Sequence, residues 1–409
     1  MSKLLLVIWG VAVLCFLTSS ALPASVQTTT VVCVPTTWQD LIVFFGVNYI
    51  AHAGTVPAIP GGRPPKSFLL PTIYLFLPFA GLWRAFILIT SHFLSEEGDI
   101  SKAFAAGAAM IVVKPNKLKH GIPIWDDGGP AVFPITLDDR DIHGSGIPLP
   151  KNNDFTFAFA IPNAAMRYDI LEDLKDPEKI KLAKSRSWVK VGVSIAQLIY
   201  SSITIYRTRG HQLDHYGYAA FGLSVFPYTL MSLANLICAG FVGEYPCVYV
   251  VRTRTMQEVT ADNGVVFDGA IGILKKTAGE GEADTAGDNG ATTAFKSGKP
   301  WRFSTLIICS ILVLVLPHLL IFLLSGFKKQ SSTVMERVWM LGWVCAGQVS
   351  FFFFSALVVF DLFTDLRNRP LRAAAIVILF LVLMAISVGG FVVVGKMIKE
   401  FDLCSLSPI

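Results

Sequence analysis

The chain has 409 residues, of which 53% are hydrophobic and only 15% are charged. A soluble domain carries closer to about a quarter charged residues, so this composition excludes an ordinary soluble globular protein. The formal net charge of +5 is spread over several polar segments rather than gathered in one stripe, which argues against nucleic acid as a partner.

The N-terminal segment, 1–24, is predicted to be a secretory signal peptide. Lys3 supplies a positive start, the run from Leu4 to Leu17 is apolar, and small residues follow at a cleavage spacing. The alternative is an uncleaved anchor helix, but the apolar run is short for a complete membrane span.

About seven apolar segments follow, each long enough to cross a hydrocarbon core about 30 Å thick. They are Trp38–Val56, Ser67–Phe93, Ser187–Tyr206, Tyr216–Val242, Phe303–Phe327, Arg337–Phe363 and Arg372–Ile398. The predicted fold class is therefore an all-α integral membrane protein with a signal peptide and about seven transmembrane helices, whose principal partner is the lipid bilayer. The predicted division is 25–93 with two helices, 187–242 with two, 303–398 with three, and a cytosolic tail, 399–409.

Two long polar segments, 94–186 and 243–302, are predicted to be extracytoplasmic loops. In the first, Ala103–Val113 is apolar but too short to span, so a packed or interfacial helix is expected there. Runs such as AVFPITL and FTFAFAIP indicate extended backbone, and the loop is expected to be irregular and partly β. Within the second, Thr277–Gly298 has few large apolar side chains and is predicted to be disordered.

Several polar side chains interrupt the predicted spans. Asn48 and His52 have the i, i+4 spacing that places two side chains on one helix face. Polar groups at this depth should face protein or water rather than lipid. Two interpretations stay open for these residues, namely hydrogen bonds that hold the bundle together and a ligand site. The other polar positions in the spans are Gln197, Asn235 and Gln348, together with Arg84, which is expected to snorkel toward the nearer interface.

The sequence H-x-x-D-H, formed by His211, Asp214 and His215, has the spacing of metal ligands on a helix. A metal centre needs at least one further ligand, and the remaining histidines form no second motif, so a hydrated loop is the favoured interpretation and no cofactor is predicted. Cys33 and Cys247 flank predicted spans on the same side and are candidates for a disulfide bond.

Four stretches resemble a family of uncharacterised multi-pass membrane proteins of filamentous fungi. They are NYIAHAGTVPAIPG (Asn48–Gly61), DIHGSGIPLP (Asp141–Pro150), the run from Ile205 to Leu236, and EYPCVYVVR (Glu244–Arg252). The resemblance implies a shared topology and a plasma membrane or endomembrane of the secretory pathway. It implies no activity, cofactor or catalytic residue.

Three functions are compatible with the sequence, which contains no P-loop, zincin or nucleophile-elbow motif. The first is a non-enzymatic role in sensing or interaction. The second is a transporter or channel, in which the polar residues of the spans line a path. The third is an enzyme that modifies a lipid or terpenoid, with Asp361 as the main intramembrane carboxylate.

Overall fold

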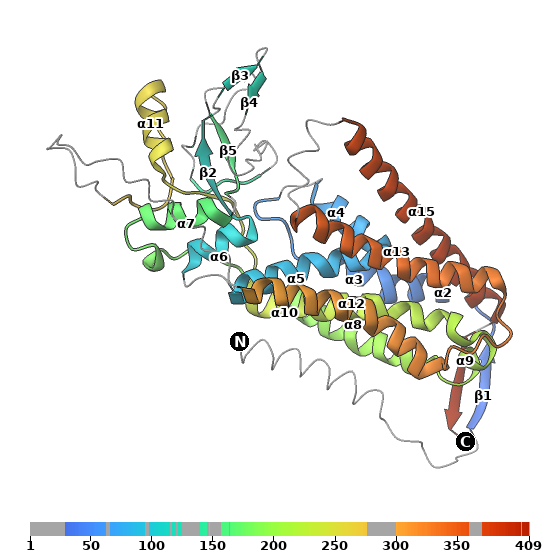
Figure 1. Ribbon diagram of the computed structural model, residues 1–409. Coiled ribbons are helices and arrows are strands. Elements are labelled where there is room, and N and C mark those ends of the chain that lie inside the picture. Colours follow the sequence, from blue (N-terminus) through green and yellow to red (C-terminus); the bar gives the residue numbers. More distant parts are fainter. Residues whose placement is uncertain are drawn as a thin grey trace.

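The computed structural model describes residues 29–62, 66–94, 98–114, 117–119, 122–124, 140–144, 147, 157–162, 164–275, 300–359, 370–401 and 403–408. The predicted signal peptide, the Thr277–Gly298 segment and Asp361 lie outside these residues. Figure 1 shows a bundle of helices with a small α/β domain at one end and two paired strands at the other. These ends are called the domain side and the strand side.

The bundle is made of helical segments, some of which follow one another directly while others are separated by the parts of the chain that form the α/β domain. Its elements are α2 (Trp38–Phe45), η1 (Gly46–Ile50), α3 (Ala51–Gly54), α4 (Lys66–Phe76), α5 (Pro78–Leu94), α8 (Trp188–Arg207), α9 (His211–Tyr216), η4 (Gly217–Ala219), η5 (Phe221–Val225), α10 (Phe226–Ile237), η6 (Cys238–Val242), α12 (Pro300–Ser325), α13 (Val334–Val359) and α15 (Pro370–Phe401).

Within the described residues, three helices are long and apolar enough to cross a membrane. They are Trp188–Arg207, Phe221–Val242 and Ala374–Glu400, and a fourth is added if the bent pair α4–α5 is counted as one span. In α8, Trp188, Val189 and Ile199 are 71%, 76% and 59% exposed. Large apolar side chains on the outside of a bundle suit a lipid environment. The prediction of a mostly helical, membrane-associated protein is confirmed. The count of about seven spans stays a prediction, since three or four helices meet the criteria for a span within the described residues.

The predicted second span, Ser67–Phe93, is two helices that meet at an angle of 119°. The break falls at Leu77, directly before Pro78, whose ring and missing N–H end the hydrogen-bond ladder of α4. The freed carbonyls at the end of α4 find new donors, because Leu75 O accepts from the Tyr228 hydroxyl and Phe76 O accepts from Trp343 Nε1 at 3.3 Å. The break before Pro78 is therefore a sharp bend, whereas Pro71 lies within α4, which continues past it to Phe76.

Both outer ends of the α4–α5 pair lie on the domain side. Before α4, Gly62 forms a backbone bridge with Arg140 of the α/β domain. After α5, the chain enters α6 (Asp99–Ala106), which belongs to the same domain. The pair thus begins and ends at one end of the bundle (Figure 1).

The two strands on the strand side join distant parts of the chain. β1 (Thr29–Val34) pairs antiparallel with β7 (Leu403–Pro408), and Cys33 lies opposite Cys404 in this register. Cys247 is a free cysteine in the α/β domain, at the other end of the bundle. The predicted Cys33–Cys247 disulfide is therefore wrong, because α4–α5 had been counted as a complete crossing and this placed both cysteines on one side.

The α/β domain combines the two long polar segments into one folded unit. Its sheet has the order β5-β2-β6, in which β2 (Ala109–Val113) pairs antiparallel with β5 (Ala158–Ala160) and parallel with β6 (Tyr249–Val250). The helices α6 and α7 (Ala164–Asp173) pack on one face and α11 (Arg254–Asn263) on the other. A short hairpin of β3 (Lys117–Lys119) and β4 (Ile122–Ile124) and the turn η3 (Pro177–Lys179) complete the domain.

The expected helix at Ala103–Val113 is only half right. α6 ends at Ala106 and Gly107 adopts a left-handed φ of 71°, after which the chain becomes the central strand. All five residues of β2 are buried, since Ile111 faces α6 and α7 while Val112 faces α11. An apolar run without alternation is what a strand covered on both faces requires. The prediction of a partly β segment is confirmed by the small sheet, which includes a strand in FTFAFAIP, whereas the AVFPITL run lies outside the described residues.

Close packing of α13 on α15 gives the first prediction. Ideal Cβ atoms added at Gly389 and Gly390 would lie 2.0 Å from Trp339 and 2.7 Å from Trp343. We expect Gly389→Ala to lower the free energy of unfolding by about 1–3 kcal/mol because the indole must move. Gly192→Ala is the matched control, since its added Cβ meets nothing within 4 Å. Thermal unfolding in detergent measures both, and equal midpoints would contradict this packing.

Candidate functional site

A group of nine buried polar side chains lies in the middle of the bundle, between three helical segments. Each segment contributes three, and none is more than 3% exposed. The nine residues, here called the polar cluster, are Asn48, His52 and Thr55 from the first segment, Ser194, Gln197 and Ser201 from α8, and Ser224, Ser232 and Asn235 from η5 and α10. Of the sequence candidates, the structure brings together Asn48, His52, Gln197 and Asn235.

The local helix geometry explains why these side chains meet. Ser194, Gln197 and Ser201 are spaced by three and four residues, so they form one stripe, and they are the buried residues of α8. In the first segment, Gly46–Ile50 is a π-helical turn, in which the Ala51 N–H donates to Gly46 O. Such wide turns rotate the following residues relative to the preceding helix and occur frequently at functional sites.

Hydrogen bonds connect the three segments through Gln197. Ser232 Oγ lies 2.5 Å from His52 Nδ1 and donates to Gln197 Oε1 over 2.9 Å. Thr55 Oγ1 lies 3.4 Å from the same Gln197 oxygen and accepts from Asn235 Nδ2 at 3.2 Å. These contacts support the interpretation of the polar residues as links between helices, since hydrogen bonds within a bilayer meet little competition from water.

The same cluster leaves polar atoms without partners. The atoms are Asn48 Oδ1, His52 Nε2, Ser194 Oγ, Gln197 Nε2 and Asn235 Oδ1. A buried polar atom that makes no hydrogen bond costs about 1–3 kcal/mol. Because the set includes acceptors, a donor and groups that do both, a small polar occupant could satisfy several of them at once. The site therefore has the chemistry of a ligand site as well as that of structural links.

The two other polar candidates serve different purposes. Gln348 Nε2 contacts the carbonyls of Val313 and Leu314 at 3.1 Å and His318 Nδ1 at 3.3 Å, so it links α13 to α12. Arg84 donates from Nε to Pro57 O at 3.0 Å and from Nη2 to Ala58 O at 2.8 Å. This guanidinium thus binds the carbonyls that follow α3, and snorkelling of Arg84 toward an interface stays a prediction.

The predicted metal ligands His211, Asp214 and His215 all lie on α9. In the part of the chain that the structure describes, no group of three His, Cys, Asp or Glu side chains could hold a metal ion, so the metal hypothesis is wrong for these residues. The segment instead packs on the loop after α12. His215 O accepts from the Ser331 N–H at 2.9 Å, which is a structural contact.

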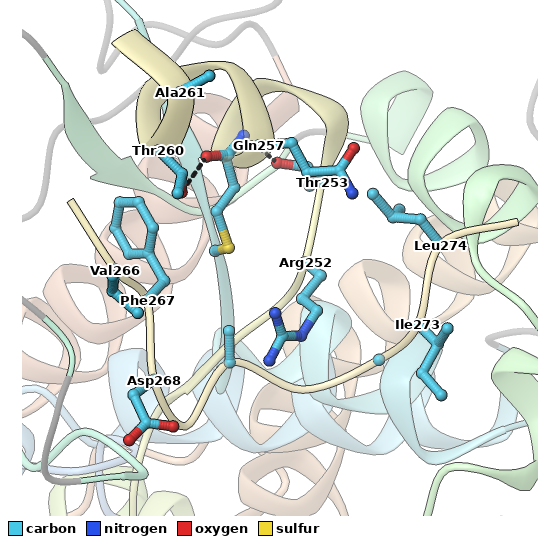
Figure 2. Close-up of a pocket in the computed structure, with 13 residues that line it drawn as sticks. Arg252, Thr253, Gln257, Thr260, Ala261, Val266, Phe267, Asp268, Ile273 and Leu274 are labelled. Carbon is cyan, nitrogen blue, oxygen red and sulfur yellow. Dashed lines mark hydrogen bonds between the residues drawn. The ribbon is translucent and has the colours of Figure 1, made fainter. Parts of the chain in front are cut away.

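A hollow lies in the α/β domain, between α11 and the segment 266–274. Its volume is about 950 Å³, and Figure 2 shows the Arg252 guanidinium directed into it. Gln257 and Asp268 are further polar groups of its lining, beside the apolar Met256 and Phe267. An open hollow with one cation suits a polar or anionic partner, although no second charged group of this lining converges on Arg252.

Buried ionisable groups in the α/β domain belong to its core. Burial lowers the pKa of Lys184, whose Nζ lies 3.7 Å from Asp99 Oδ1 and 5.1 Å from the ring centre of Tyr245. Burial also raises the pKa of Tyr249 to about 12. Tyr249 donates from its hydroxyl to Ala183 O at 3.4 Å. These contacts attach the segment before α8 to the sheet.

Sequence reasoning missed the serines and the threonine of the polar cluster. Thr55, Ser194, Ser201 and Ser232 each lie three or four residues from His52, Gln197 or Asn235, so their spacing was a usable signal. Which of these side chains bond to one another depends on the approach of α10 to α3 and α8, which the spacing does not reveal. No protein-family model, curated protein or solved structure matches this chain.

The hydrogen bonds of the polar cluster give the second prediction. Gln197→Met keeps the side-chain volume but removes the acceptor of Ser232 and Thr55, so we expect a loss of about 1 kcal/mol in the free energy of unfolding. Ser194→Ala is the matched control one turn away, and it should be neutral or stabilising because it removes an atom that has no partner. Thermal unfolding in detergent distinguishes the two. A larger loss for Ser194→Ala would refute this assignment of the network.

Proposed function

We propose that this chain is a multi-pass membrane protein that binds a small, uncharged, polar solute in its polar cluster and lets it pass through the bundle. The observation that carries the proposal is the set of five buried polar atoms without partners, which come from three segments that are joined by hydrogen bonds through Gln197 and Thr55. A bundle that needed only structural links would satisfy these atoms, since each one costs stability. A bound solute or water supplies the missing hydrogen bonds.

The composition of the cluster favours an uncharged solute. Asn, Gln, Ser, Thr and His offer both donors and acceptors, as hydroxyl and amide solutes require. Among the described residues, no carboxylate, lysine or arginine belongs to the cluster. An ion at this depth would need a countercharge, because a lone charge in a bilayer is costly to bury. Polyols and urea-like amides are therefore the proposed solute class.

Sensing or interaction is the second candidate function. It is favoured by the α/β domain, which carries the hollow around Arg252 and is joined to the bundle through Ser185 and Glu244. The fungal family resemblance and the secretory location stay predictions. The lipid- or terpenoid-modifying alternative rests on Asp361, which lies outside the described residues, and it also stays a prediction.

We propose a membrane topology with an even number of crossings, in place of the seven crossings that the sequence predicts. The α4–α5 pair is a re-entrant hairpin that does not cross, and the other long helical segments give an even number of crossings between β1 and β7. The support is the 119° bend, with both ends of the pair on the domain side, and the pairing of the two terminal strands. Both strands lie on one side of the membrane, and the α/β domain lies on the opposite side.

Transport is tested in liposomes with purified protein. We expect glycerol or urea to enter protein-containing vesicles faster than empty ones, measured by stopped-flow light scattering. Asn235→Leu and His52→Leu should reduce this rate at least about tenfold, because they remove polar partners from a low-dielectric path. Ile199→Ala, on the exposed face of α8, is the control and should leave it unchanged. If glycerol and urea both enter protein-containing vesicles at the same rate as empty vesicles, the proposed transport is refuted.

Topology is tested with single glycosylation sequons, each in a short insert. One follows Ser25, one lies within Thr277–Gly298 and one follows Ile409. Because β1 and β7 are paired, the first and third sequons should share one outcome and the second should show the opposite outcome. Seven crossings predict instead that the first and second sequons share an outcome. A sequon is glycosylated if the protein migrates more slowly on a gel and if treatment with an endoglycosidase removes this shift.

A further inference from the structure

The polar cluster has a charged boundary on the domain side. Lys190 precedes Ser194 by four residues and so continues the polar stripe of α8 toward the α/β domain. Its Nζ lies 2.6 Å from Glu244 Oε1 and 3.5 Å from Val56 O. Both side chains are half-buried, with exposures of 25% and 20%. Val56 directly follows Thr55, a member of the cluster, so this ion pair lies at the end of the cluster that faces the domain side.

Glu244 connects the three segments that surround this boundary. Its carboxylate also accepts from the Ala58 N–H at 3.1 Å, which holds the chain after α3. Its backbone exchanges two hydrogen bonds of 2.9 Å with Ser185, just before α8. Gly243, at φ 74°, turns the chain out of η6 so that Glu244 reaches this position. The carboxylate and the backbone of Glu244 together thus join the ends of α3, α8 and η6.

An aromatic layer lies beside the polar cluster. It consists of Tyr49, Tyr228, Trp343 and Phe391, with ring centres of Tyr49 and Tyr228 4.9 Å apart and of Trp343 and Phe391 4.7 Å apart. Tyr49 and Tyr228 are at most 1% exposed. The hydroxyl of Tyr49 is bonded to Ser224 Oγ at 2.7 Å, so this layer offers few hydrogen bonds to a solute.

We propose that solute reaches the polar cluster from the domain side, past the Lys190–Glu244 ion pair, which acts as its gate and excludes charged solutes. The inference rests on the proposed function, because it names the entrance of the same site. Breaking the pair frees the end of α8 from the chain after α3 and opens the way to Ser194. A charged solute competes with one partner of the pair and must leave the other partner uncompensated in a half-buried position.

The gate is tested by the reactivity of an introduced cysteine, which does not depend on transport. Ser194→Cys is placed in the full chain with its native cysteines replaced by alanine, since the Ser194 hydroxyl has no partner to lose. Sealed membrane vesicles of both orientations are treated with a membrane-impermeant methanethiosulfonate. Two exposed marker positions identify the sides, Ile273→Cys for the domain side and Lys329→Cys for the strand side.

We expect Ser194→Cys to react slowly from the domain side and more slowly still from the strand side, which lies farther along α8. Adding Glu244→Gln should raise the rate about tenfold, because the open state becomes more populated. The exchange Lys190→Glu with Glu244→Lys restores an ion pair and should return the slow rate, which separates gating from misfolding. Ser201→Cys, on the same stripe but farther from the gate, is the matched control and should stay unreactive from the domain side.

A reaction of Ser194→Cys from the strand side that is as fast as the reaction from the domain side, or no reaction from the domain side, would overturn the inference. An unchanged rate in Glu244→Gln would overturn the gate as well. If the cysteine results are as expected but glycerol and urea do not enter liposomes, the entrance stands and the proposed transport fails. If glycerol or urea enters liposomes as expected but the cysteine results contradict the gate, the proposed transport stands and the proposed entrance fails.

Discussion

A bilayer core contains no water to pair a buried polar group, and the helix bundle is built around this constraint. α8 turns Ser194, Gln197 and Ser201 inward and large apolar side chains outward. Its polar stripe cannot face lipid, so it must meet the polar residues of α3 and α10. The contact among these three segments therefore fixes which faces of the helices touch, and the remaining helices pack around it.

The broken pair α4–α5 follows from the same constraint. A helix that ends inside the bundle leaves backbone carbonyls without donors, which is tolerated only where the surrounding protein supplies them. Tyr228 and Trp343 do so for the last carbonyls of α4. These two residues also belong to the aromatic layer beside the polar cluster. The break in the chain and this layer thus share the same side chains.

The α/β domain and the bundle meet where the polar cluster ends. Parallel pairing of β2 with β6 joins two segments that are separated in sequence by α8 and α10. The ends of these helices are thereby held together next to the Lys190–Glu244 pair. A partner bound to the domain would act on the same helix ends, which is how the two candidate functions could be connected in one molecule.

The sequence alone determined the membrane environment, the approximate positions of the long helices and the inward orientation of Asn48, His52, Gln197 and Asn235. These features depend on local composition and on the 3.6-residue period, which any one segment reveals. Only the tertiary structure decided that Ser67–Phe93 turns back at Leu77, that Ala109–Val113 is a central strand, and that Cys33 lies far from Cys247. Each of these depends on partners distant in sequence, because an apolar run does not reveal whether lipid, a sheet or another helix will cover it.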